Sequence, residues 1–164
     1  MEQKKKIIGI TGGVGAGKSS VLALLKENFG AKIILADLVA HELMEPGSEG
    51  LKKVTEALGT SFHALDGKAL ADVIFRNKDA LRTMNAIIHP LVWKTMAEAA
   101  ESAEEQLVII EAAVFDTAPK DLFDELWYVY TTKENRIIRL MANRGYSREK
   151  CEDIIGRQAS EEEY

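Results

Sequence analysis

The stretch from Gly12 to Ser19 carries the strongest chemical signal in the sequence. It reads GGVGAGKS and fits the G-x-x-x-x-G-K-S pattern of a phosphate-binding loop. Glycines let backbone amides turn toward phosphate oxygens with no Cβ in the way, and a following helix adds about half a positive charge at its N-terminus. Lys18 can supply a point charge to the β- and γ-phosphates, and the Ser19 hydroxyl can ligate Mg²⁺. The motif therefore predicts a site for a nucleoside triphosphate.

The residues around the loop supply the elements that such a site needs. The apolar run Lys6–Thr11 predicts a buried strand before the loop, and Ser19–Asn28 predicts a helix after it. The apolar face of that helix consists of Val21, Leu22, Leu24 and Leu25. The predicted nucleotide contacts are Gly12, Gly13, Val14, Gly15, Ala16, Gly17, Lys18, Ser19 and Ser20.

The loop leaves the reaction open, because many classes of nucleotide-binding protein share it. A GTPase would usually carry N-K-x-D, and the run Asn77-Lys78-Asp79-Ala80 has its acid one position early. Asp37 lies just after a second predicted strand, 31–35, and its position alone fits a helix N-cap and a functional carboxylate equally well. The small size of the chain and this acid at a strand end favour a small-molecule kinase.

The rest of the chain alternates strands with helices. The run 107–110, which ends at Glu111, and the aromatic run 126–130 predict two more strands, with Trp127, Tyr128 and Tyr130 in the core. Further helices are predicted over 38–44, 50–58, 68–75, 77–103, 134–143 and 148–158. Pro90 is expected to kink or split the longest of them near His89. This alternation predicts an α/β fold with a central parallel sheet covered by helices on both faces.

The composition excludes several classes of protein. The chain has 164 residues, of which 46% are hydrophobic and 29% charged, as is typical of one soluble globular domain. Its formal net charge of -5 argues against nucleic acid or an anionic membrane as a partner. Cys151 is the single cysteine, so no intrachain disulfide can form, and the sequence has no long apolar stretch that could span a membrane. We therefore expect a cytoplasmic protein of undetermined oligomeric state.

Several short motifs occur along the chain in an order typical of one enzyme family. They are the phosphate loop, Ala36-Asp37, Glu45-Pro46-Gly47, NAIIHP from Asn85 to Pro90, EAAV from Glu111 to Val114, Arg144, and Arg157-Gln158. With these motifs the chain resembles the dephospho-CoA kinases. The resemblance implies ATP-dependent phosphorylation of the ribose 3′-hydroxyl of dephospho-CoA, the last step of coenzyme A synthesis. It implies ATP and Mg²⁺ as cofactors and a small molecule, dephospho-CoA, as the partner.

The resemblance also implies an architecture. It predicts a three-layer α/β/α phosphate-loop fold whose nucleotide core comprises residues 1–46 and 104–143. A helical CoA-binding part is expected at about 47–103, and a lid at about 144–158. The chain ends at Tyr164, where relatives continue with a further strand and a terminal helix, so we expect these two elements to be absent from this sequence.

The resemblance assigns roles to individual residues. Asp37 is implied as the catalytic base or positioner of the acceptor hydroxyl, and Glu111 as an acid behind Mg²⁺ or the acceptor. Lys18 and Arg144 are implied in catalysis, and Arg144 and Arg157 as lid arginines that close on the ATP phosphates; the plain alternative for both arginines is a solvated helix face. His89 is a candidate substrate contact, with packing at a helix kink as the alternative.

Departures from the family pattern leave two other functions open. Leu35 stands where the family usually has the first acid of Asp-Ala-Asp, and His41 stands where it frequently has an arginine. The chain could be another phosphate-loop kinase of a nucleoside, nucleotide or small metabolite. It could also be an ATP-binding module without turnover. A panel of acceptors assayed with ATP and Mg²⁺ separates these three hypotheses.

Overall fold

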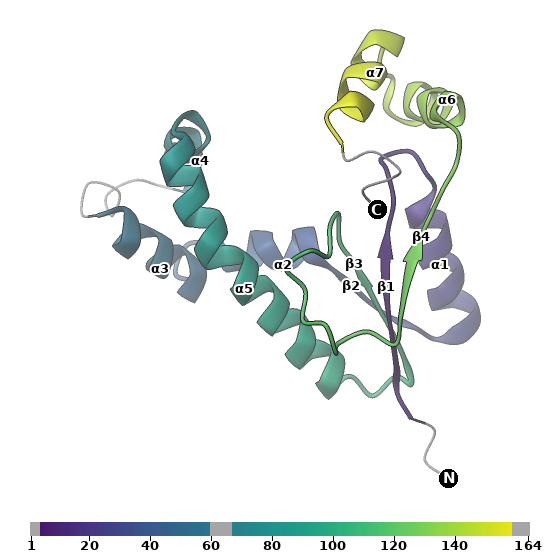
Figure 1. The fold of residues 1–164 in the computed structure, drawn as a ribbon, viewed down its shortest axis with the longest axis horizontal. Coiled ribbons are helices and arrows are strands. Elements are labelled where there is room, and N and C mark those ends of the chain that lie inside the picture. The colour runs from purple at the N-terminus through teal and green to yellow at the C-terminus, as the bar shows by residue number, and fades with distance from the viewer. Residues whose placement is uncertain (1–3, 60–66, 159–164) are drawn as a thin grey trace. The chain divides into compact units, whose positions relative to one another are not determined.

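The strands of the chain form one four-stranded sheet. The computed structural model describes residues 4–59 and 67–158. The sheet order is β2-β3-β1-β4, and β1 pairs in parallel with both β3 and β4 (Figure 1). The strands are β1 (Lys6–Thr11), β2 (Lys32–Leu35), β3 (Leu107–Glu111) and β4 (Glu125–Tyr128). This arrangement confirms the predicted α/β fold with a central parallel sheet.

The helices lie where the sequence predicts them, with ends shifted by a residue or two. They are α1 (Lys18–Phe29), α2 (Ala36–Leu43), α3 (Glu49–Leu58), α4 (Gly67–Arg76), α5 (Lys78–Ser102), α6 (Lys133–Arg144) and α7 (Arg148–Gly156). Helix α5 runs through Pro90 as one helix, so the expected split does not occur. Buried residues on both sides of the proline, Ile88 before it and Val92 and Met96 after it, hold the two halves in one packed helix.

The chain divides into two compact units, each with its own internal contacts. The sheet unit comprises residues 1–34, 103–116 and 120–164, and it contains α1, α6 and α7 together with nearly the whole sheet. The helical unit comprises residues 35–102 and 117–119, and it contains α2, α3, α4 and α5.

The core of the sheet unit lies between the sheet and α1. Ile8, Ile10 and Ile109 are buried there together with Ala31, and Val21, Leu22 and Leu25 of α1 pack against them. Leu24 is 56% exposed, so its predicted place on the apolar face is wrong; it lies on the side of α1 turned away from this cluster.

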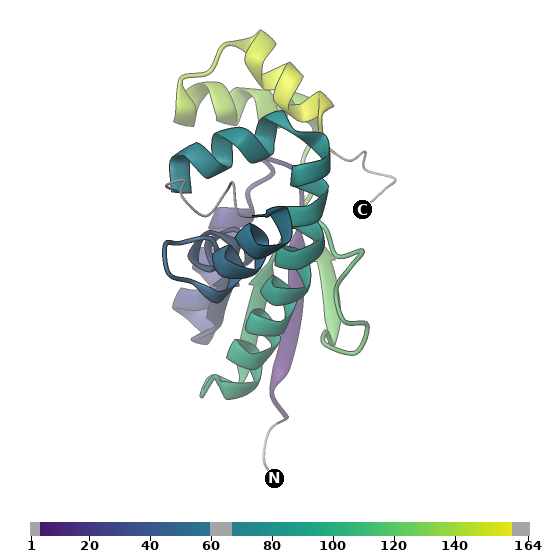
Figure 2. The same cartoon turned by 90° about the vertical axis from the view of Figure 1, so that its left-hand side faces the viewer.

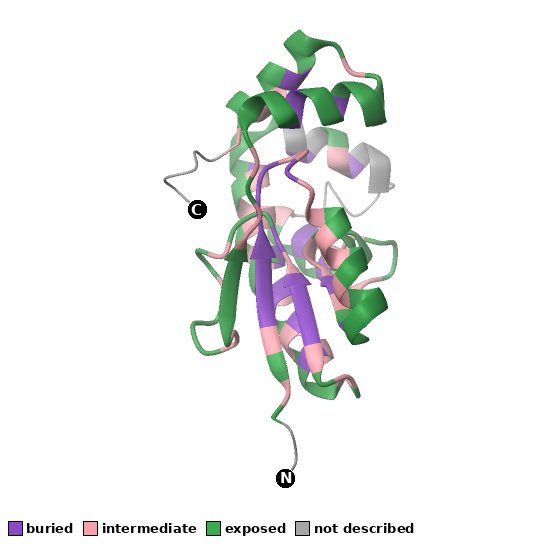
Figure 3. Cartoon of the chain, turned by 90° about the vertical axis from the view of Figure 1, so that its right-hand side faces the viewer, coloured by how far each residue is buried: buried purple, intermediate pink, exposed green. Residues whose placement is uncertain are grey.

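Strand β4 is exposed, whereas β1 and β3 are largely buried (Figure 3). Trp127 is 38% and Tyr130 56% exposed, so the prediction that these aromatic residues are core residues is wrong. For Trp127 the reason is position, since β4 is an edge strand with one neighbour and the sequence pattern does not distinguish edge from central strands, whereas Tyr130 lies beyond the end of β4.

The helical unit is organised around α5, which packs against α2, α3 and α4 (Figure 2). Val54, Leu70, Ile74, Trp93 and Met96 are buried in it. Gly50 lets α2 and α3 approach closely, because a Cβ at this position would lie 2.2 Å from the carbonyl oxygen of Leu43. Within the described ranges, no helix has the length and apolarity needed to cross a membrane.

Candidate active site

The predicted phosphate loop connects the end of β1 to the start of α1. Gly15 and Gly17 adopt φ angles of 76° and 105°, which residues with a Cβ rarely adopt, and Gly17 is the N-cap residue of α1. The amide of Ala16 donates to the carbonyl of Gly13 at 3.0 Å and closes a turn inside the loop. The strand–loop–helix arrangement expected from the sequence is therefore confirmed.

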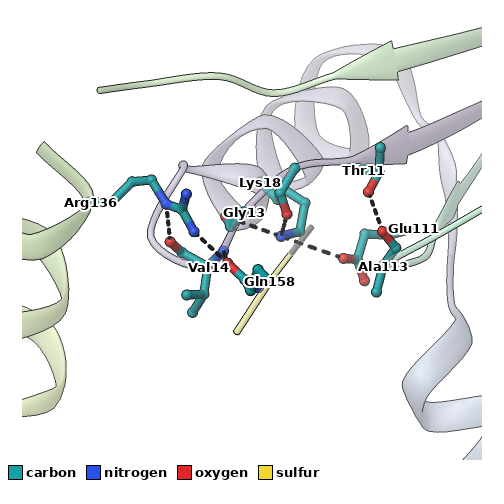
Figure 4. A network of polar contacts seen from close by, with 9 residues as sticks. Thr11, Gly13, Val14, Lys18, Glu111, Ala113, Arg136 and Gln158 are labelled. Atoms are coloured by element: carbon teal, nitrogen blue, oxygen red, sulfur yellow. Dashed lines mark hydrogen bonds and ion pairs between the residues drawn. The ribbon is translucent and has the colours of Figure 1, made fainter. Parts of the chain in front are cut away.

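Lys18 lies with its ammonium group against the loop. Its Nζ donates to the carbonyl oxygen of Gly12 at 2.5 Å and to that of Gly13 at 3.4 Å (Figure 4). It also lies 3.9 Å from Oε1 of Glu111, the last residue of β3, and both side chains are less than a fifth exposed. The structure thus brings two of the predicted site residues, Lys18 and Glu111, together at the carboxyl ends of two neighbouring parallel strands.

Two arginines of α6 bind carbonyl oxygens of the loop. Nε of Arg136 donates to the carbonyl of Val14 at 2.8 Å (Figure 4), and Nη1 of Arg139 donates to the carbonyls of Ala16 at 2.9 Å and Gly15 at 3.3 Å. Neither arginine belongs to a motif that the sequence offers. Their spacing of three residues on a predicted helix is the only signal that could have pointed to them, and it names no partner.

Gln158 completes the contacts around the loop. Its Oε1 accepts hydrogen bonds from the amide of Val14 at 3.0 Å and from Nη2 of Arg136 (Figure 4). In the sequence this glutamine belongs to the Arg157-Gln158 motif, which predicts no role for it. In the structure it lies directly after α7 and its C-cap residue Arg157, and it ties the end of that helix to the phosphate loop.

The loop has the electrostatic character of an anion-binding site. Its carbonyl oxygens accept hydrogen bonds from cationic side chains, while the amides of Gly15 and Gly17 make no hydrogen bond within the described ranges. The start of α1 adds the positive end of a helix dipole, and Lys18 adds a full charge. Such a combination binds phosphate groups.

One further hydrogen bond joins the end of β1 to the segment that follows β3. Oγ1 of the buried Thr11 donates to the carbonyl of Ala113 at 2.8 Å (Figure 4). This bond links the last residue of β1 to the segment that follows Glu111, so the start of the loop and the Glu111 carboxylate share a fixed support.

Asp37 lies in the helical unit, in the first turn of α2, and is exposed. The N-cap residue of α2 is Leu35, so Asp37 is not the helix cap that its position in the sequence allowed. The carboxylate is therefore accessible, and a capping role does not account for its presence.

The two predicted lid arginines lie on the helices α6 and α7. Arg144 is the last residue of α6 and is exposed, and no hydrogen bond or ion pair of its side chain is found in the described part of the chain. The guanidinium of Arg157 pairs with the carboxylate of Asp153 at 2.9 Å, one turn earlier in the chain. In this structure Arg157 therefore contacts its own helix rather than the phosphate loop.

His89 lines a pocket of about 390 Å³ within the helical unit. Arg82, Asn85, Ala86, Pro90 and Thr117 form the rest of its wall. Nε1 of the buried Trp93 donates to Oγ1 of Thr117 at 3.1 Å, so this wall residue is held by a core side chain. His89 is exposed and lies on α5 directly before Pro90, through which the helix continues.

Comparison with known proteins decides between the open hypotheses. The profile of the family described as CoaE, dephospho-CoA kinase, matches residues 6–164. Dephospho-CoA kinase from Geobacter sulfurreducens is 35% identical over 165 residues, which cover 96% of this chain and 83% of that protein. The chain belongs to the dephospho-CoA kinase family. The Streptomyces avermitilis dephospho-CoA kinase is 36% identical over 161 residues, covering 94% of this chain and 78% of its own.

Solved structures share the fold of this chain. The crystal structure of TT1252 from Thermus thermophilus matches with a TM-score of 0.74 at 32% identity, covering 98% of this chain and 83% of that one. The dephospho-CoA kinase from Campylobacter jejuni has a TM-score of 0.53 at 21% identity, covering 93% and 79%, and supports the fold alone. As a dephospho-CoA kinase the chain is an ATP-using phosphotransferase that converts dephospho-CoA to CoA.

Proposed function

We propose that the chain transfers the γ-phosphoryl group of ATP to the ribose 3′-hydroxyl of dephospho-CoA, with the phosphate loop as the ATP site. The observation that carries this proposal is the loop itself, where the Lys18 ammonium lies against the loop and the amides of Gly15 and Gly17 make no hydrogen bond within the described ranges. In the transfer, the hydroxyl oxygen bonds to the γ-phosphorus, the bond from that phosphorus to the β–γ bridging oxygen breaks, and ADP leaves.

Lys18 is proposed to follow the phosphates during this transfer. In the structure its Nζ binds the carbonyls of Gly12 and Gly13 and lies 3.9 Å from Glu111. A triphosphate offers acceptors of higher charge, and bonds between charged partners are about twice as strong as neutral ones. Lys18 would therefore exchange carbonyl contacts for phosphate oxygens and stabilise the charge that develops between the β- and γ-phosphates.

The residues beside the loop fit a magnesium ion. The Ser19 hydroxyl lies in the first turn of α1 and forms no hydrogen bond within the described ranges, and oxygen ligands are the ones that Mg²⁺ prefers. Ser19 would hold the ion together with phosphate oxygens. The Glu111 carboxylate, 3.9 Å from the Lys18 ammonium, is proposed to add negative charge behind the ion. The ion supplies charge neutralisation at the phosphates.

Asp37 is proposed to receive the proton of the acceptor hydroxyl. Its exposed carboxylate, free of a capping role, can accept a hydrogen bond from the 3′-hydroxyl and orient the oxygen for in-line attack. Because phosphoryl transfer needs little proton abstraction early in the transition state, an ionised aspartate can take the proton late. Arg144 and Arg157 are proposed to close on the phosphates, which for Arg157 requires release of Asp153.

The pocket on α5 is proposed to receive part of dephospho-CoA. It combines an apolar floor with two groups, Arg82 and His89, that can donate hydrogen bonds to the anionic or amide oxygens of this substrate. The single cysteine, Cys151, is buried and free, which suits the reducing cytoplasm that we propose as the location.

A coupled assay of ADP release with dephospho-CoA as acceptor tests the proposed function. We expect Asp37→Asn to lower kcat by at least about a hundredfold with little change in the KM for ATP, as general-base residues do. Asp72→Asn, which removes an exposed acid on α4, is the matched control and should leave kcat unchanged. An unchanged kcat in Asp37→Asn would remove Asp37 from the mechanism. Binding of ATP without phosphorylation of any acceptor would favour the non-catalytic alternative.

A further inference from the structure

Every carbonyl oxygen from Gly12 to Ala16 accepts a hydrogen bond from a cationic side chain. Lys18 serves the carbonyls of Gly12 and Gly13, Arg136 that of Val14, and Arg139 those of Gly15 and Ala16. The two arginines come from consecutive turns of α6, which lies more than a hundred residues further along the chain. Three consecutive carbonyls of the phosphate loop, those of Val14, Gly15 and Ala16, are therefore bound by a single helix.

This arrangement fixes the direction of the loop amides. The C=O and N–H groups of a trans peptide point to opposite sides of its plane. When Arg136 and Arg139 bind the carbonyls of Val14 and Ala16, the amides of Gly15 and Gly17 must point away from α6. These are the amides that make no hydrogen bond within the described part of the chain, and they are the ones available to an anion.

The side chain of Arg136 is buried. It is 8% exposed, and its hydrogen-bond acceptors within the described ranges are neutral oxygens of Val14 and Gln158. No described carboxylate pairs with it, so its charge adds to the positive potential around the loop. A Cβ on Gly13 would lie 2.3 Å from its guanidinium, so the loop sequence itself leaves room for this side chain.

We propose that Arg136, Arg139 and Gln158 form a clamp on the phosphate loop and are positioning residues for ATP binding. The two arginines bind loop carbonyls, and Gln158 binds the amide of Val14. The clamp holds the phosphate loop in its anion-binding shape before the nucleotide arrives, and so lowers the free-energy cost of ordering it. Arg136 and Arg139 precede the predicted lid and Gln158 ends it, so the clamp also ties both ends of that segment to the loop. The inference rests on the proposed function in one respect, that the loop binds ATP.

Calorimetric titration of ATP with Mg²⁺ into the full chain tests the clamp. Loss of a hydrogen bond to a charged group typically weakens binding about ten- to hundredfold, so Gln158→Ala should raise the Kd for ATP about tenfold and Arg136→Ala by more. Lys133→Ala, which removes an exposed cation on the same helix, is the control and should leave the Kd unchanged. The double variant should lose less than the product of the two single losses, because both side chains hold Val14.

Two further readouts separate positioning from a merely structural role. In steady state, Gln158→Ala should raise the KM for ATP while the KM for dephospho-CoA changes less than about twofold. In the protein without nucleotide, the amide NMR signals of Gly15 and Gly17 should shift in Gln158→Ala but not in Lys133→Ala. Because the NMR spectra are recorded without nucleotide, a shift of these signals would report the shape of the loop and not a lost phosphate contact. Arg136 is buried, and Arg136→Ala could fail to fold for that reason. Arg136→Lys then replaces it, because a lysine keeps the positive charge and removes the guanidinium that binds Val14 and Gln158.

Several results would overturn the clamp. An unchanged Kd for ATP in Gln158→Ala and Arg136→Lys would do so, as would a fall in kcat with both KM values unchanged, because a smaller folded fraction produces that pattern. Unshifted amide signals of Gly15 and Gly17 would also contradict it. If the wild-type chain itself does not bind ATP, the proposed function fails first, and the two failures are thereby distinguished.

Discussion

Replacing Gly13 by alanine tests how closely α6 fits the phosphate loop. The backbone of Gly13 is not in the left-handed region, so an alanine is compatible with its conformation. The three atoms nearest to the added Cβ all belong to the guanidinium of Arg136, at 2.3, 2.3 and 2.7 Å. Since these distances are far below van der Waals contact, the end of the arginine side chain must move.

The expected size of the effect follows from the bonds that the movement breaks. Displacing the guanidinium removes the 2.8 Å bond to the carbonyl of Val14 and the bond to Gln158. Bonds to charged groups contribute about 1.5–3 kcal/mol each, so losing even one of the two corresponds to a roughly ten- to 150-fold increase in the KM for ATP. The assay is steady-state ADP release at saturating dephospho-CoA. The same substitution made together with Arg136→Ala should add less than about a twofold further loss, because its clash partner is gone.

Two outcomes would contradict the close fit between α6 and the phosphate loop. If Gly13→Ala leaves the KM for ATP unchanged, the guanidinium does not fill the space above Gly13 in solution. If the two substitutions multiply their effects in the double variant, the alanine acts through some other contact, and the close fit between α6 and the loop is refuted.

Two other substitutions probe the sheet unit and α7. Asp124 accepts a hydrogen bond from the amide of Ile7, and this bond, together with the charges of Lys4 and Lys6, holds the pKa of its carboxyl below the ordinary value. A lowered pKa in the folded state adds stability above the ordinary pKa, and that stability is lost as the pH falls through the folded-state pKa. Asp124→Asn should therefore make urea unfolding midpoints less dependent on pH between about 5 and 3, and an unaltered pH dependence would contradict this linkage. Gly156 is the last residue of α7, its φ angle is not in the left-handed region, and an added Cβ would have no atom within 4 Å. Gly156→Ala should therefore stabilise the chain by about 0.5–1 kcal/mol in urea unfolding. Destabilisation would show that α7 is packed more tightly at this position.

The sequence predicts those features of the fold that depend on local patterns. The phosphate loop and its flanking strand and helix follow from glycine spacing and a short apolar run, and the structure has them at Lys6–Thr11 and Lys18–Phe29. The parallel sheet follows from the alternation of strands and helices. Local pattern fails where tertiary position decides: Trp127 is exposed because β4 lies at the sheet edge, and α5 passes through Pro90 because packing on both sides holds it.

The candidate site is predictable to a smaller extent. Residues within one motif, such as Lys18 and Ser19, are found from spacing alone, and Glu111 is found because it ends a strand. Arg136 lies more than a hundred residues from the carbonyl that it binds, and the helical pattern around it describes only which face is apolar. No local rule connects an arginine on a late helix with a loop near the start of the chain, so the clamp becomes visible only when the fold is known.

Product analysis of a single reaction tests the central claim most directly. The chain is incubated with γ-labelled ATP, Mg²⁺ and dephospho-CoA, in parallel with Lys18→Ala, and the acceptor is analysed by mass spectrometry and by cleavage of the 3′-phosphate. We predict label in a product that has gained one phosphoryl group at the ribose 3′-position, with a rate lowered at least about a hundredfold in Lys18→Ala. Labelled inorganic phosphate without a labelled acceptor, or equal rates in the two proteins, would contradict a phosphate loop that passes the γ-phosphoryl group to dephospho-CoA.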